Sequence, residues 1–192
     1  MKKIPSIFNR DWNGNRTLVT QEPNPECAWV FAGEGTPTRK WDGTSCLVQG
    51  GKLFKRYELK LGKTPPDGFI PAQDVDTETG KQPGWVPVGE GPDDAYHRLA
   101  WNQEIEDSHA PPADGTYELV GPKVQGNPDV FEGYALVRHG AAILASVPRT
   151  FKGLKDYLSF VPMEGIVWHH PDGRMAKIKS RDLGIAWPPK PA

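Results

Sequence analysis

Cysteine and long apolar runs are both scarce in this chain of 192 residues. The two cysteines, Cys27 and Cys46, cannot form a disulfide framework and instead favour a reducing, cytoplasmic setting. No segment approaches the roughly 20 consecutive apolar residues of a membrane helix, and the start of the chain lacks the apolar core of a signal peptide. The sequence therefore predicts an ordinary soluble, cytoplasmic protein with no membrane partner.

Positive charge is not in excess either, because 23 Lys and Arg residues face 24 Asp and Glu residues, giving a net charge of −1. This balance disfavours a generally basic nucleic-acid binder, so any polyanion contact must come from a local cluster. No G-x-x-x-x-G-K-[ST] phosphate loop occurs, so a nucleotide would be bound by other means. Two basic clusters are present: Lys52, Lys55, Arg56, Lys60 and Lys63, and later Arg174, Lys177, Lys179 and Arg181.

Glycine and proline are abundant, with 21 and 20 residues, which indicates many turns and few long helices. Apolar alternation between turn residues predicts short strands, and helix-start signals at Pro92 and Thr150 predict two helices. We therefore expect an α+β protein with antiparallel β-sheets and flanking short helices, in a single domain over 1–192. The predicted strands span 28–32, 44–48, 52–59, 116–120, 134–137, 164–168 and 175–179, and the helices span 93–105 and the residues after Thr150.

Three further expectations concern packing. The segment 62–92 holds six prolines and is expected to be a long Pro/Gly-rich loop. The proline-rich tail, 186–192, is expected to fray. In the helix over 93–105, Ala95, Leu99 and Asn102 are expected to share one face, with Tyr96 and Ala100 beside them.

The stretch from Thr38 to Thr44 contains the first candidate for chemistry. Lys40 can act as a nucleophile if its surroundings lower its pKa, and the Asp42-Gly43 pair is typical of a tight turn. The simpler interpretation is a hairpin turn that carries a surface lysine. The stretch alone favours this simpler interpretation.

Two cations and two carboxylates lie on later predicted strands. Lys177 and Lys179 fall on one strand face, and a polyanion would compensate their two positive charges. Alternation predicts burial of at least one of Glu118 and Glu164. Taken singly, each carboxylate is equally well a surface strand residue, and the lysines a solvated edge strand. The pair at 169–170, two histidines, lacks a third ligand at a recognisable spacing and is interpreted as part of a loop.

In combination, these residues resemble the motifs of the covalent nucleotidyltransferases, which include ATP-dependent ligases and mRNA capping enzymes. The matching segments, in the order of that superfamily, are 40–43 (K-x-D-G), Arg56, 117–121, 134–137, 164–167 (E-G-x-V) and 177–179 (K-x-K). The segments 65–71, 84–92 and 163–179 are similar to a small ATP-dependent 5′–3′ RNA ligase family, and the likeness covers about residues 30–182. Because few residues follow Lys179, we expect no C-terminal OB-fold domain.

The resemblance implies the nucleotidyltransferase (adenylation domain) fold and an ATP-dependent RNA ligase. Lys40 would form lysyl-AMP, AMP would pass to an RNA 5′-phosphate, and an RNA 3′-hydroxyl would expel it. The resemblance further implies the following site: Lys40 as nucleophile; Thr38, Arg39, Asp42, Gly43, Arg56, Glu118, Glu164, Lys177 and Lys179 as nucleotide-binding residues; and Glu164 and Glu118 as ligands of Mg²⁺ or Mn²⁺.

The expected partner is RNA with 5′-phosphate and 3′-hydroxyl ends, and the expected state is a monomer without a protein partner. Two alternatives stay open at this point. One is an AMP-transferase that adenylylates ends or proteins without sealing them. The other is a non-catalytic nucleotide- or RNA-binding relative.

Overall fold

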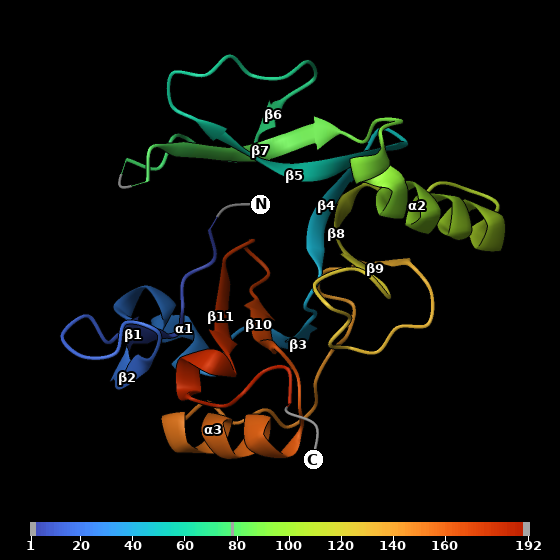
Figure 1. The fold of residues 1–192 in the computed structure, drawn as a ribbon. Coiled ribbons are helices and arrows are strands. Elements are labelled where there is room, and N and C mark those ends of the chain that lie inside the picture. The colour runs from blue at the N-terminus through green and yellow to red at the C-terminus, as the bar shows by residue number, and fades with distance from the viewer. Residues whose placement is uncertain (1–2, 78, 190–192) are drawn as a thin grey trace. The chain divides into compact units, whose positions relative to one another are not determined.

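The chain forms two compact units, each built from separate stretches of the sequence. A computed structural model describes residues 3–77 and 79–189. Unit 1 contains Lys3 and residues 42–139, and unit 2 contains residues 4–41 and 140–189. Each unit combines antiparallel strands with short helices (Figure 1). The expected α+β class with antiparallel sheets is confirmed, whereas the single domain stays a prediction.

Unit 1 is built on a six-stranded antiparallel sheet with the strand order β6-β7-β5-β4-β8-β9. The strands are β4 (Thr44–Gln49), β5 (Lys52–Lys60), β6 (Ile70–Pro71), β7 (Lys81–Pro87), β8 (Gly115–Val120) and β9 (Ala135–Arg138). The hairpin expected between 44–48 and 52–59 is confirmed, because Gly50 and Gly51 both adopt the positive φ that such a tight turn requires.

The helix α2 (Ala95–Ser108), which follows the short 3-10 helix η2 (Pro92–Asp94), packs against one face of this sheet (Figure 1). The helix is confirmed, and Tyr96 and Ala100 pack on the core, but Leu99 and Asn102 do not lie on the buried side as expected. Leu99 is 51 % exposed, whereas Ala100 is fully buried. Apolar residues are spread around the helix, so the sequence offers no single stripe, and the small Ala100 allows the closest approach to the strands. The core beneath it consists of Cys46, Val48, Leu53, Tyr117, Leu119, Val124 and Leu136.

The segment 62–92 is not a loop throughout, because β6 and β7 lie within it. β7 pairs with β5 at seven positions, from Phe54↔Pro87 to Lys60↔Lys81. Proline and glycine made this segment resemble a loop. Pro83 is tolerated in β7 because its missing N–H costs no hydrogen bond to β5. Its carbonyl accepts from the Ala72 N–H at 2.9 Å, on the side of β7 away from β5.

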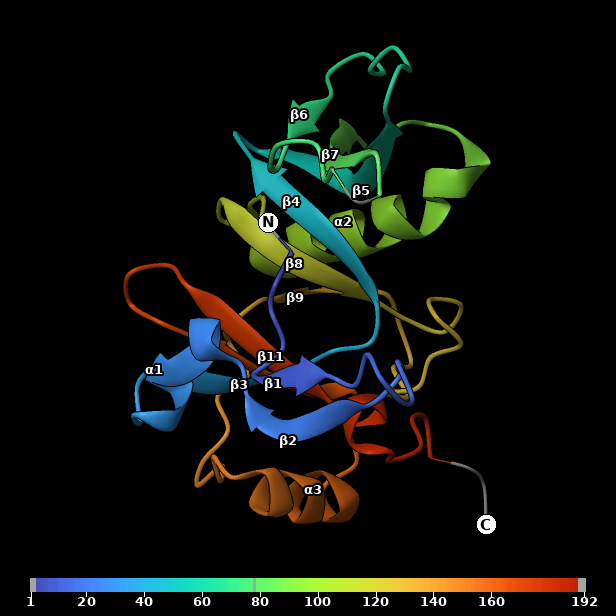
Figure 2. The same ribbon diagram turned by 90° about the vertical axis from the view of Figure 1, so that its left-hand side faces the viewer.

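Unit 2 contains a three-stranded antiparallel sheet with the order β11-β10-β3 and a separate two-stranded sheet, β1-β2. The N-terminal segment adds a parallel bridge from Ser6 to Lys177 of β11, so β1 and β2 lie close to that strand (Figure 2). The elements are β1 (Phe8–Arg10), β2 (Val19–Pro23), η1 (Pro25–Cys27), α1 (Ala28–Phe31), β3 (Thr36–Lys40), α3 (Phe151–Phe160), β10 (Gly165–His169), β11 (Met175–Lys179) and η3 (Arg181–Leu183).

The prediction of a buried strand over 28–32 is wrong, because these residues form the short helix α1. A brief apolar run does not distinguish a buried strand from a buried helix by periodicity. The preceding residues decide the outcome. The Asn24 side chain accepts a hydrogen bond from the Glu26 N–H at 3.0 Å, and Pro25 opens the 3-10 turn that continues into α1.

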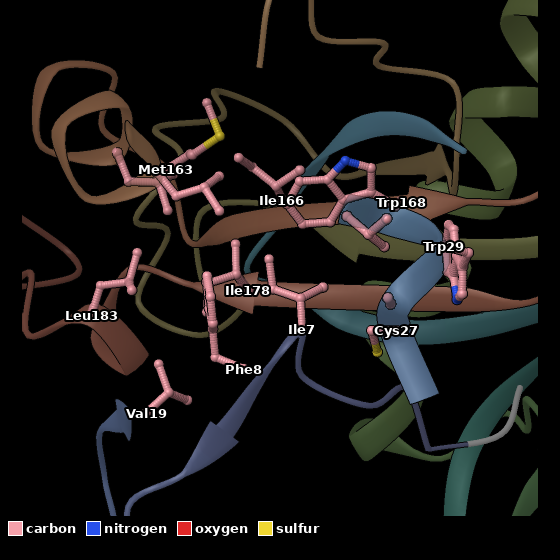
Figure 3. Packing of buried hydrophobic residues seen from close by; sticks show 14 residues of the cluster. Ile7, Phe8, Val19, Cys27, Trp29, Met163, Ile166, Trp168, Ile178 and Leu183 are labelled. Carbon is pink, nitrogen blue, oxygen red and sulfur yellow. The ribbon is translucent and has the colours of Figure 1, made fainter. Parts of the chain in front are cut away.

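The core of unit 2 lies along β10 and β11. Figure 3 shows Ile166 and Trp168 of β10 and Ile178 of β11 gathered with Ile7 of the N-terminal segment. The helix after Thr150 is confirmed as α3: the Thr150 hydroxyl accepts a hydrogen bond from the Gly153 N–H at 3.2 Å, and Leu154 and Leu158 are buried in the same core.

Near the end of the chain, Trp187 is buried, and its carbonyl oxygen accepts two hydrogen bonds from the Arg181 guanidinium at 2.6 and 2.8 Å. The expected frayed tail over 186–192 therefore begins with a residue that is held in place. Residues 190–192 lie outside the described part of the chain.

Candidate functional site

The Asp42-Gly43 pair does not close a hairpin, so this part of the simpler interpretation is wrong. β3 pairs with β10, whereas β4 pairs with β5 and β8. The chain leaves unit 2 after Trp41 and enters unit 1 at Asp42. Gly43 does not have the positive φ expected of a turn glycine. It is required for another reason: a Cβ atom here would lie 2.1 Å from the carbonyl oxygen of Leu119.

Three lysines share one face of the three-stranded sheet in unit 2. Gly165 of β10 is paired with Lys40 of β3 on one side and with Lys179 of β11 on the other, and Val167 is paired with Lys177 in the same way. Directly paired residues of an antiparallel sheet point to the same face, as do residues two apart along a strand. The lysine face is therefore defined by Lys40, Lys177 and Lys179, and it brings together the first and the last motif of the sequence.

Glu164 joins two of these lysines. Its Oε2 atom forms a short ion pair with the Lys40 Nζ atom, and its Oε1 atom lies 2.8 Å from the Lys179 Nζ atom. The Glu164 side chain is only 8 % exposed, and that of Lys40 22 %. Removing one partner of such a buried pair leaves a charge without compensation, so the three side chains act as one unit. The interpretation of Glu164 as a surface residue is wrong.

Gly165 allows the lysine face to be this compact. A Cβ atom at this position would lie 2.1 Å from the carbonyl oxygen of Ile178. Only a residue without a side chain lets β10 and β11 approach so closely at the point where Lys40, Glu164 and Lys179 meet.

Lys177 gives the face an excess of positive charge. Within the described part of the chain, its ammonium group makes no ion pair, although the carboxylates of Asp182 and Glu164 are near enough to act on it electrostatically. Burial, reinforced by the neighbouring charges of Lys179 and Lys40, lowers the pKa of Lys177 from 10.5 to about 8. β11 is not the free edge of the simpler interpretation, because the Lys177 backbone is bonded to Pro5 and Ile7 at 2.9 Å.

Thr38 and Arg39, both expected to bind nucleotide, are placed differently: Thr38 is on the lysine face by its pairing with Val167, whereas Arg39 is not. The Thr38 side chain is 1 % exposed, and its hydroxyl donates to the Val167 carbonyl oxygen at 3.1 Å. Arg39 is paired with Ile166, so it points to the sheet face opposite the lysine face, and its guanidinium lies 4.4 Å from the centre of the Trp41 ring. The structure therefore does not bring Arg39 to the lysine face.

Arg56 and Glu118, the expected nucleoside ligands, share one face of the sheet in unit 1. Glu118 is paired with Ser45, which precedes Cys46, and Arg56 follows Lys55, the partner of Cys46, so alternation puts both Glu118 and Arg56 on the face opposite Cys46. This face is opposite the one that carries Cys46 and packs against α2. The Arg56 guanidinium lies 5.1 Å from the centre of the Trp85 ring, its partner on β7, and its desolvation lowers the pKa of Arg56.

Glu118 is buried and held by two donors, which corrects its interpretation as a surface residue. Its Oε1 atom accepts from the Gly43 N–H at 3.2 Å, and its Oε2 atom lies 2.8 Å from Nε2 of His139. Nearby, the Asp42 N–H donates to the Asp129 carboxylate at 3.1 Å. Sequence reasoning missed His139 and Asp129, since neither belongs to a spaced motif; the only signal for His139 was its position directly after a predicted strand.

Among residues 3–77 and 79–189, no three His, Cys, Asp or Glu side chains are grouped as a metal site would need. The helices of the same residues include none with the length and apolar character needed to cross a bilayer.

Comparison with known proteins was made for the whole chain. A family model described as RNA ligase 1 matches residues 103–192. Curated proteins named RNA ligase 1 match most of the chain: that of Mus musculus is 30% identical over 97% of this chain and 81% of its own length, and that of Pongo abelii is 29% identical over 97% and 82%. The match in Danio rerio is 29% identical over 88% of this chain and 68% of that protein. This chain belongs to the RNA ligase 1 family.

Membership in the RNA ligase 1 family confirms the resemblance to RNA ligases. The family model covers only part of the predicted site. The segment matched by the family model contains Glu118, Glu164, Lys177 and Lys179, and also His139. Lys40 lies outside that segment, and the roles of all these residues, including that of Lys40 as nucleophile, stay predictions.

Proposed function

We propose that this protein is an ATP-dependent RNA ligase that joins a 5′-phosphate end to a 3′-hydroxyl end through an AMP group carried on Lys40. The observation that carries the proposal is the lysine face. Lys40 is held by Glu164 at the end of β3, beside Lys177 and Lys179 on the same sheet face. Membership in the RNA ligase 1 family supports RNA as the substrate.

The lysine face has the composition that phosphoryl chemistry needs. In the first step, a bond forms between the Lys40 Nζ atom and the α-phosphorus of ATP, and the bond to pyrophosphate breaks. The amine must be unprotonated to attack, so the Lys40 ammonium has to give a proton to the Glu164 carboxylate that it contacts or to water. Lys177 and Lys179 stabilise the negative charge that accumulates on the phosphate oxygens and on the departing pyrophosphate.

The following two steps return Lys40 to its starting state. The AMP group passes from Lys40 to the 5′-phosphate of RNA, and a new phosphoanhydride replaces the bond to nitrogen. The 3′-hydroxyl of the second end then attacks that 5′-phosphate, and AMP leaves as the phosphodiester forms. The lysine face has spare positive charge to hold RNA phosphates as well as those of ATP.

ATP and Mg²⁺ are compatible with the residues present. The three lysines around Glu164 match a polyphosphate, and in unit 1 Glu118 and Arg56 share a face suited to the hydroxyls and charge of a nucleotide. Mg²⁺ is commonly bound by one or two carboxylates together with substrate phosphates and water, so a three-residue protein cluster is not required. We propose Glu164, on the lysine face, as such a carboxylate; the metal would neutralise charge on the phosphates.

The test of this proposal uses a 5′-phosphorylated RNA with a free 3′-hydroxyl, ATP and Mg²⁺. We expect a joined or circular product that resists phosphatase, and no product with Lys40→Arg, which keeps a positive partner for Glu164 but cannot carry AMP. An RNA that is adenylylated at its 5′ end yet never joined would indicate an AMP-transferase. Tight ATP binding without pyrophosphate release would indicate a non-catalytic relative.

The matched control is Lys155→Arg, because Lys155 is exposed on α3 of the same unit. This variant should join RNA as the wild type does. Equal loss of product in Lys40→Arg and Lys155→Arg would contradict the assignment of the nucleophile.

A further inference from the structure

His139 makes a contact in unit 1 that the proposed chemistry leaves without a purpose. It follows β9 directly, and its backbone N–H donates to the Thr116 carbonyl at 3.0 Å, which continues the pairing between β8 and β9. This register places His139 on the same sheet face as Glu118. Its Nε2 atom reaches the Glu118 carboxylate at 2.8 Å, and its side chain is 20 % exposed.

The contact fixes how the Glu118 carboxylate is oriented. An ionised carboxylate only accepts hydrogen bonds, so Nε2 of His139 must carry a proton in this pair. The Gly43 N–H holds the other oxygen at 3.2 Å. Each oxygen therefore has one protein donor and keeps a lone pair for another, and the carboxylate can accept from two neighbouring hydroxyls at once.

Two polar atoms on this face have no hydrogen-bond partner within the described residues. They are Nδ1 of His139 and the hydroxyl oxygen of Ser45, and both are buried. Ser45 is the direct partner of Glu118 in the pairing of β4 with β8. Buried polar atoms are nearly always satisfied, so two such atoms on either side of a fixed carboxylate indicate a polar ligand that supplies the missing bonds.

We propose that His139 is a positioning residue that holds Glu118 so that, with Ser45, it binds the ribose hydroxyls of the nucleotide. A ribose offers two adjacent hydroxyls that donate to Glu118, and the Ser45 hydroxyl can in turn donate to the oxygen of one of them. A 2′-deoxynucleotide leaves one of these partners unsatisfied. The face consequently selects ribonucleotides over deoxyribonucleotides, and the inference rests on the proposed use of ATP.

Calorimetry of ATP and 2′-deoxyATP binding tests the inference. A chelator is present, so that no AMP is transferred to the protein and only equilibrium binding is measured. Hydrogen bonds to a charged group change affinity by roughly 10-fold or more. We expect the wild type to bind ATP roughly 10-fold more tightly than 2′-deoxyATP. His139→Ala should weaken ATP binding by about that factor and 2′-deoxyATP binding much less.

Two further variants separate positioning from general damage. His139→Gln places an amide donor close to the position of Nε2 and should restore most of the preference for ATP. His109→Asn, at the exposed end of α2, should leave the preference unchanged. Thermal unfolding of each variant checks its folding, and if His139→Ala does not fold, His139→Gln and the comparison of the two nucleotides on the wild type still decide.

The inference is overturned if the wild type binds both nucleotides equally, or if His139→Ala weakens both by the same factor. It is also overturned if His139→Gln behaves like His139→Ala. Failure of the proposed function looks different: the wild type then prefers ATP over 2′-deoxyATP, as inferred, yet never becomes joined to AMP when Mg²⁺ is added. A wild type that binds no ATP contradicts both.

Discussion

Replacing Lys177 by methionine should stabilise the protein at neutral pH while impairing its chemistry. Burial and the charges of Lys179 and Lys40 lower the pKa of Lys177 from 10.5 to about 8. This difference corresponds to a destabilisation of about 3 kcal/mol when the side chain is charged in the folded state. Because Lys177 is not fully buried, we expect Lys177→Met to raise the free energy of unfolding by roughly 1–3 kcal/mol at pH 7.

The pH dependence follows from the direction of the shift. Below pH 8, Lys177 is protonated in the folded and unfolded states, so the whole cost is present. Between about pH 8 and 10.5, the folded state releases the proton while the unfolded state still binds it, and stability recovers as pH rises. The advantage of Lys177→Met over the wild type should therefore shrink across this range.

Urea unfolding of both proteins at pH 7 and pH 10 measures this effect. The control is Lys155→Met, which removes an exposed lysine of the same unit and should change stability little at either pH. A Lys177→Met protein that is no more stable than the wild type at pH 7 would refute the reasoning. So would an advantage that stays constant between the two pH values.

Two other substitutions test the packing around the site. Gly165→Ala places a methyl group where a backbone carbonyl lies 2.1 Å away. We expect the free energy of unfolding in urea to fall by about 1–3 kcal/mol and RNA joining to decrease. Unchanged stability would show that β10 and β11 can separate freely. Thr150→Ala removes the N-cap of α3 and should cost about 1 kcal/mol without affecting ATP binding; a matching loss of binding would mean that the cap acts on the site.

The lysine face is the part of the site that the sequence predicts best. Alternation places Lys177 and Lys179 on one side of a strand, and the turn at 171–174 predicts the hairpin with the strand that follows Glu164. These are local relations, and local patterns are readable without knowledge of the fold. The burial of Glu164 was anticipated only as one of two possibilities.

The partner of β3 could not be read from the sequence in the same way. Lys40 and Gly165 are paired although they lie far apart in the chain, and the nearby Asp42-Gly43 pair suggested a hairpin with β4 instead. A turn signal in the sequence reports only on neighbouring residues, whereas the structure pairs β3 with the distant strand β10. Arg39 is affected as well: because it is next to Lys40 in a strand, it lies on the face of the sheet opposite the lysine face.

His139 and α1 illustrate two other reasons for failure. His139 reaches Glu118 only through the pairing of β8 with β9, which no spacing rule encodes. The apolar residues of α1 fit a strand or a helix equally well, and the cap at Asn24 decides between them.

The central claim is that Lys40 becomes covalently bound to AMP, and intact-protein mass spectrometry after incubation with ATP and Mg²⁺ tests it most directly. We predict that the wild type gains the mass of one AMP, that fragment spectra place it on Lys40, and that pyrophosphate removes it. Lys40→Arg should gain nothing, whereas Lys155→Arg should react as the wild type does. An unmodified wild type, or an AMP group attached at any other residue, would contradict the account.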